Sequence, residues 1–162
     1  MRIATAALIA PALIALAAAV PAHAEPALEA RSAMRACLEA VIDGAPVGNV
    51  KGLDVEVRRE NEPDACTVQV TAGSPSDVRA AVLEAIMERP EGFAPAKTSW
   101  DPGSYGTRET FCNAPGGIPV NVVVSTARPH APGLILLATA LRAAQRDARC
   151  DLDAGLQRST PD

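Results

Sequence analysis

The chain has 162 residues, a formal net charge of −4 and a hydrophobic fraction of 48%. This length is too short for two full domains. The acidic balance argues against a general nucleic-acid binder, which needs cationic side chains to neutralise phosphates, and the chain is too apolar to be disordered. Because many of the hydrophobic residues fall within the first 24, the sequence predicts an apolar leader followed by one globular domain.

Residues 1–24 have the order of a secretory signal peptide. Arg2 supplies a positive charge, and Ile3–Val20 forms an apolar run. Ala22-His23-Ala24 then places small residues at positions −3 and −1 of a cut before Glu25. This is the pattern that signal peptidase recognises, so we expect export.

An uncleaved membrane anchor is the alternative for this leader, because about 20 apolar residues can span a bilayer. Pro11 within the run and the small residues at its exit favour cleavage. No later stretch approaches 18 consecutive apolar residues, so we predict no membrane span after signal cleavage. The predicted location is the bacterial periplasm, with secretion as the alternative. Residues 25–150 are expected to form a single domain and 151–162 a flexible tail.

The first half of the mature chain reads as a helix, a β-hairpin and a second helix. Apolar residues recur at spacings of three and four over 26–43, which predicts an amphipathic helix. Residues 53–58 and 66–71 alternate between apolar and polar, which predicts two strands, with 59–65 as their connection.

A second helix is predicted to start just after Ser74, and Pro90 and Gly92 are expected to end it. Ser74 is the expected N-cap, Pro75 occupies the first helical position, and Asp77 completes a spacing like that of a capping box. The expected buried stripe contains Val78, Val82, Leu83, Ile86 and Met87.

The second half is predicted to contain another hairpin and a last helix. Residues 90–106 show no periodicity, and this segment is long for a loop in a compact domain. Strands are expected over 107–113 and 118–126, on either side of the tight turn 114–117. Residues 134–149 are expected to form a helix. Its apolar face would carry Leu134, Leu137, Leu141 and Ala148.

The expected element order is therefore α-β-β-α-β-β-α. Antiparallel hairpins with helices packed on one face predict an α+β fold, a two-layer α/β sandwich. Whether all four strands share one sheet stays open at this stage.

The chain contains four cysteines, and an even number in a small exported domain implies disulfides. Three pairings are possible. Cys37 lies on the inward face of the first helix, and Cys66 lies on the apolar face of the second strand. Cys112 ends the third strand, and Cys150 ends the expected last helix. The preferred pairs are therefore Cys37–Cys66 and Cys112–Cys150.

A zinc site or a redox-active pair would need closely spaced cysteines such as C-x-x-C. The four cysteines are far apart in the sequence, so we predict neither a metal site nor a cofactor.

The four aromatic residues fall within one short stretch of the chain. Phe93, Trp100, Tyr105 and Phe111 lie within 19 consecutive positions, and three of them fall in the aperiodic segment. Trp and Tyr are favoured at recognition surfaces because they combine large rigid area with a polar tip. The alternative is that the aromatics pin an irregular loop onto the sheet. Phe93, Trp100 and Tyr105 are therefore candidate binding residues.

His130 is the histidine that remains after signal cleavage, and it is the simplest candidate for a general base near neutral pH. It lies between Pro129 and Pro132, in a segment that connects a strand to a helix. No acid or nucleophile is fixed beside it in the sequence, so an exposed loop histidine is the alternative. We keep His130 as a candidate binding residue and assign no catalytic residue, since no catalytic motif occurs.

These observations favour a non-enzymatic binding or protein-interaction module with an unknown protein or small-molecule partner and no nucleic acid. Two alternatives stay open. One is a small exported hydrolase with His130 as the base. The other is an exported inhibitor of a protease or lysozyme-like enzyme.

Overall fold

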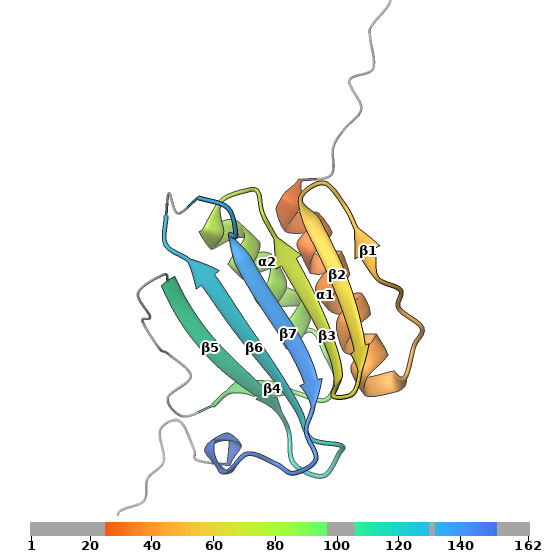
Figure 1. Cartoon of the computed structure of the whole chain (residues 1–162). Coiled ribbons are helices and arrows are strands. Elements are labelled where there is room, and N and C mark those ends of the chain that lie inside the picture. The colour runs from red at the N-terminus through yellow and green to blue at the C-terminus, as the bar shows by residue number, and fades with distance from the viewer. Residues whose placement is uncertain (1–24, 97–105, 130–131, 152–162) are drawn as a thin grey trace, which may run out of the picture.

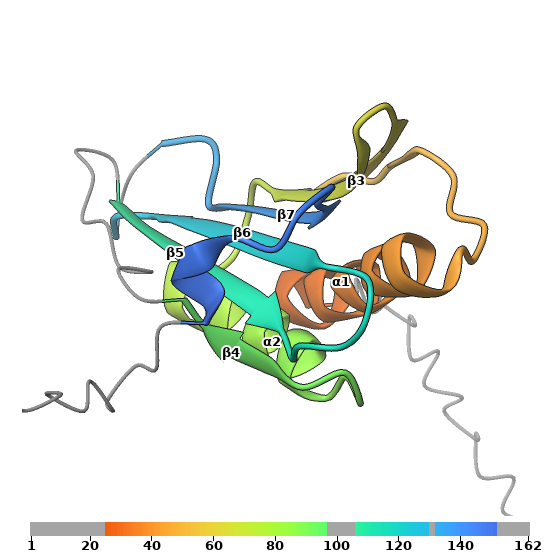
Figure 2. The ribbon, with the colours of Figure 1, turned by 90° about the horizontal axis from the view of Figure 1, so that it is seen from below.

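In the computed structural model, which describes residues 25–96, 106–129 and 132–151, two helices accompany a seven-stranded antiparallel sheet (Figure 1). The sheet order is β1-β2-β3-β7-β6-β5-β4. Figure 2 shows both helices on the same side of the sheet. The elements are α1 (Pro26–Asp43), β1 (Val50–Lys51), β2 (Val55–Asn61), β3 (Asp64–Val70), α2 (Pro75–Met87), β4 (Phe93–Pro95), β5 (Gly106–Asn113), β6 (Val120–Ala127), β7 (Leu136–Arg142) and the 3₁₀ turn η1 (Ala148–Cys150).

Helix α1 has the bounds that its apolar spacing predicts. Pro26 occupies the first turn, where a missing N–H costs no hydrogen bond. Gly44 ends the helix in the left-handed conformation with φ of 72°, and the next N–H, of Ala45, donates to Glu39 O over 3.2 Å. The face that packs against the sheet contains Ala30, Met34, Cys37, Leu38 and Val41.

Helix α2 begins at Pro75 and ends at Met87, so its predicted start is confirmed and it ends before Pro90. Ser74 occupies the N-cap position, but its side chain caps no backbone N–H. Its Oγ instead lies 2.8 Å from Ser76 Oγ, so the predicted capping interaction is wrong. Val78 is buried against the core as expected, whereas Met87, at the last helical position, is 46% exposed.

The first hairpin is longer than expected. Residues 59–65, predicted as a connection, continue both strands, so that only Glu62 and Pro63 form the turn. The Arg59 guanidinium forms an ion pair with Asp64 and donates to Ala65 O over 2.8 Å. These bonds hold the two strands together to their ends.

The second hairpin, β5–β6, forms close to its predicted bounds. The side chain of Asn113 braces the connection, because its Oδ1 accepts from Val120 N over 2.9 Å and its Nδ2 donates to Ile118 O over 2.8 Å. Within the stretch predicted to be aperiodic, Phe93–Pro95 pairs with β5 as the short edge strand β4.

The predicted last helix is wrong. Residues 136–142 form strand β7, which lies between β3 and β6 and joins the two hairpins into one sheet (Figure 1). Leu136, Ala138 and Ala140 face the core, and the residues between them are only partly buried. The strand is favoured over the helix because it pairs with the backbones of β3 and β6. Without it, both of these strands would be unpaired sheet edges, which are prone to pairing with other chains. Only residues 148–150 form a helical turn.

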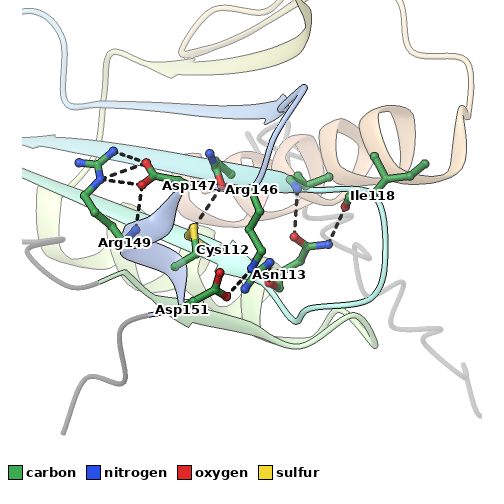
Figure 3. The surroundings of a disulfide bond; sticks show 10 residues. Cys112, Asn113, Ile118, Arg146, Asp147, Arg149 and Asp151 are labelled. Atoms are coloured by element: carbon green, nitrogen blue, oxygen red, sulfur yellow. Dashed lines mark hydrogen bonds and ion pairs between the residues drawn. A yellow bond between two sulfur atoms is a disulfide. The ribbon is translucent and has the colours of Figure 1, made fainter. Parts of the chain in front are cut away.

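Both disulfides are present. The Cys37–Cys66 bond joins α1 to β3 inside the core, where both residues are 0% exposed. The Cys112–Cys150 bond instead holds residues 143–151, the C-terminal segment, against the other face of the sheet (Figure 3). Cys150 therefore lies in a 3₁₀ turn and not at the end of a long helix.

Candidate functional site

The face of the sheet opposite the helices, here the open face, is covered by neither helix (Figure 2). Side chains alternate between the two faces of a strand, and the strand register arranges those of the open face in three rows that cross the sheet. The middle row contains Arg58, Thr67, Thr139, Val123 and Thr110. The upper row, near the start of β7, contains Lys51, Glu56, Gln69, Leu137, Ser125 and Arg108. The lower row contains Glu60, Ala65, Leu141, Asn121, Cys112 and Ala94. The C-terminal segment lies over Asn121 and Cys112 of this row.

The centre of the open face carries no charged side chain on the three central strands β3, β7 and β6. All of the charged members of the rows lie on the flanking strands β1, β2 and β5. In the middle of this surface, Thr67 Oγ1 and Thr139 Oγ1 lie 3.0 Å apart and form a hydrogen bond. A centre depleted of charge within a polar rim is the pattern of a protein–protein interface.

The edges of the sheet are less suited to binding an additional strand. Strand β1 has only two residues, and β4 has three and ends in Pro95, which has no N–H to donate. Short strands and proline are devices that protect sheet edges from pairing with other chains. Contacts through the open face therefore fit this sheet better than main-chain pairing at its edges.

The outer surface of the helices is covered by ion pairs. Arg31 lies 3.1 Å from Glu84 and also pairs with Glu88. Hydrogen bonds from Arg35 and Arg31 lower the pKa of Glu88 below its usual value. This charged surface is what solvated helices ordinarily show and differs clearly from the open face.

One carboxylate is buried on the helix side of the sheet. Glu109 is 8% exposed and accepts two hydrogen bonds of 2.6 Å from the guanidinium of Arg79, which joins β5 to α2. The same contact raises the pKa of Arg79 above its usual value. Because both carboxylate oxygens are engaged by a permanently charged group, Glu109 serves structure and is a poor general acid or base.

Within the three described ranges, no group of three His, Cys, Asp or Glu residues is arranged to hold a metal ion. Neither α1 nor α2 is long and apolar enough to cross a membrane.

The structure places only one of the four predicted binding residues. Phe93 is 7% exposed and belongs to the core, together with Phe111 on the neighbouring strand. Trp100, Tyr105 and His130 lie outside the described residues. Their role in binding stays a prediction.

Sequence analysis missed the open face because its middle strand was assigned to a helix. The polar alternation of residues 66–71 did indicate one half of the surface. The other half depends on Thr139 and Val123, whose proximity to Thr67 follows from strand pairing over a long sequence distance. Residues 136–140 read Leu-Leu-Ala-Thr-Ala and alternate in neither size nor polarity, so their local pattern contained no signal for this strand.

Comparisons of this chain with models of protein families, with curated proteins and with solved structures give no match. The interpretation of the open face therefore depends on its own geometry and chemistry.

Proposed function

We propose that this chain is an exported, non-enzymatic module that binds a partner protein through the open face of its sheet. Its expected location is the periplasm, with secretion as the alternative. The apolar leader with its small-residue exit supports export, and two disulfides suit an oxidising compartment.

The observation that carries the proposal is the uncharged centre of the open face. Charged residues make up 21% of the chain, yet β3, β7 and β6 carry none on this face. A partner that covers these strands does not have to remove water from charged side chains. That removal is costly wherever no opposite charge takes the place of the water. Threonine and valine also lose little rotamer freedom on binding, because branching at Cβ already restricts them.

Site-specific photo-crosslinking in the native host tests the proposal. A benzophenone amino acid replaces Val123 in one variant and Ser32 in the matched control. Val123 lies in the middle row of the open face, and Ser32 is exposed on α1. We expect protein adducts from Val123 and none from Ser32. The absence of adducts from Val123, or the same adducts from both positions, would contradict binding through the open face.

Intact-mass measurement of the recovered protein tests export separately. Cleavage before Glu25 gives a mature chain that begins at this residue. Recovery of a chain that still begins at Met1 would show that the leader is not a cleaved signal.

A further inference from the structure

We infer that the occupant of the open face is a second copy of this chain, packed face to face in a symmetric dimer. This inference rests on the proposed function, because it uses the same surface and adds the identity of the partner. In a two-fold interface the same patch is used by both copies, so the patch must be complementary to itself.

The position of β7 supplies the symmetry. It is the middle one of the five long strands, with β2 and β3 on one side and β6 and β5 on the other. Thr139 is the middle residue of β7 and of the middle row. A two-fold axis that runs parallel to β7 and passes over Thr139 places β2 above β5 of the other copy, and β3 above β6.

This arrangement brings opposite charges together. The upper row has Glu56 near one end and Arg108 at the other, so the axis places each Glu56 over Arg108 of the second copy. Glu56 Oε1 accepts from Arg58 over 2.9 Å. Its other carboxylate oxygen accepts no hydrogen bond from the described residues, and Arg108 forms no ion pair with them. Complementary charges at a rim steer association and fix the orientation of the copies.

The alternative symmetric orientation is unfavourable. An axis perpendicular to the strands stacks each strand over itself and exchanges the upper and lower rows. It would place Arg58 over Arg58 and Glu56 over Glu60. Like charges in contact destabilise an interface, so the orientation parallel to β7 is selected.

The size of the surface predicts a weak dimer. The C-terminal segment lies over Cys112 and Asn121, so these two positions of the lower row are not free. With strands about 4.8 Å apart and rows about 6.8 Å apart, the remaining positions of the five strands form a platform of about 420 Å². Two such platforms bury about 850 Å² in total, which is below the usual size of a stable specific interface. We therefore expect reversible association that depends strongly on protein concentration.

Sedimentation velocity of the purified mature protein tests the inference. Between about 1 μM and about 1 mM, a range that spans weak interfaces, the mean mass should rise from one chain toward two. In the Thr139→Arg variant the two new guanidinium groups face each other across the axis, so the rise should disappear. Ser32→Arg adds the same charge on the exposed surface of α1 and should leave the rise unchanged. A wild-type chain that stays monomeric throughout would overturn the inference.

A charge exchange tests the orientation. Glu56→Arg and Arg108→Glu should each weaken self-association about tenfold, because each replaces two attractive contacts by repulsive ones. An equimolar mixture of the two variants should associate about as well as wild type, since every contact between unlike variants pairs Arg with Glu. A mixture that associates no better than either variant alone would exclude this orientation. Circular dichroism spectra that match wild type establish that the variants are folded.

The two proposals fail differently. If the wild-type chain is monomeric and the Val123 crosslinker captures a protein of another mass, the second copy is wrong and the proposed function stands. If Val123 gives no adduct and the chain is monomeric, both are wrong. An adduct with twice the mass of the chain supports both.

Discussion

Two adjacent leucines on β7 provide a direct test of how this strand is placed. Leu136 faces the core and is 0% exposed, whereas Leu137 lies on the open face and is only partly buried. Replacing each by alanine removes the same atoms from opposite faces of the sheet. Leu136→Ala should therefore destabilise the protein far more than Leu137→Ala.

The expected magnitudes follow from what surrounds each side chain. Leu136 is fully buried in the core, and strand pairing fixes its lateral neighbours Val70 and Thr126, so the site can close only partly around a smaller side chain. Buried Leu→Ala changes cost about 2–5 kcal/mol, and a rigid site belongs in the upper part of that range. On the open face, water fills the space that Leu137 leaves, and the expected cost is below about 1 kcal/mol.

Urea unfolding followed by circular dichroism measures both values. Protein concentrations should be low enough for the chain to be monomeric, and equal slopes against urea show that the two-state comparison is valid. If Leu137→Ala were the more damaging change, the strand would be refuted. A helix over 134–149 would be favoured instead, since it would bury Leu137 on its apolar face.

Three further outcomes are expected. Alanine at both cysteines of the Cys112–Cys150 bond, which closes 38 residues, should cost up to about 4 kcal/mol in urea unfolding. The same change at Cys37–Cys66 should cost more, because two fully buried sulfurs are lost as well; a reversed order would contradict this. Glu109→Gln should cost about 1–3 kcal/mol in thermal unfolding, since it breaks a partly buried bidentate ion pair. Hydrogen bonds from Arg149 lower the pKa of Asp147 from 3.8 to about 2. Because its folded pKa is below the unfolded one, Asp147 favours the folded state above about pH 4, and this contribution is lost as the pH falls through 2. Carboxyl ¹³C titration should give a midpoint near 2 that returns toward 3.8 in Arg149→Ala.

Elements with strong contrast between their two faces were predictable from the sequence. Helix α1 has charged residues such as Arg31 and Arg35 on one side and apolar residues on the other, so its period of 3.6 is plain. Strand β2 alternates valine with Glu56 and Arg58, so its period of two is equally plain. In both, the faces differ because one meets the core and the other meets water.

Strand β7 lacks that contrast. Leucine occupies both faces, and Leu134, Leu137 and Leu141 also fit the spacing of a helix. What decides the structure is tertiary: β3 and β6 each need a partner, and a segment of seven residues fills the space between them. Local pattern alone does not contain this information, because propensity is overridden by pairing at a distance.

The absence of charged residues on the open face of β7 also makes this face unusual. A preference of central strands for branched residues accounts for Thr67, Thr139 and Val123, but it does not require the absence of charge. Strands β2 and β3 belong to one hairpin and share this face, yet β2 presents Glu56 and Arg58 there while β3 presents none. The change occurs between adjacent strands and follows the distance from the sheet centre. This is the distribution expected when the centre is covered by a partner and the rim stays in water. Strand preference also disfavours Asp, Glu and Lys, but Glu56 and Arg58 on β2 show that this sheet tolerates charge on the same face.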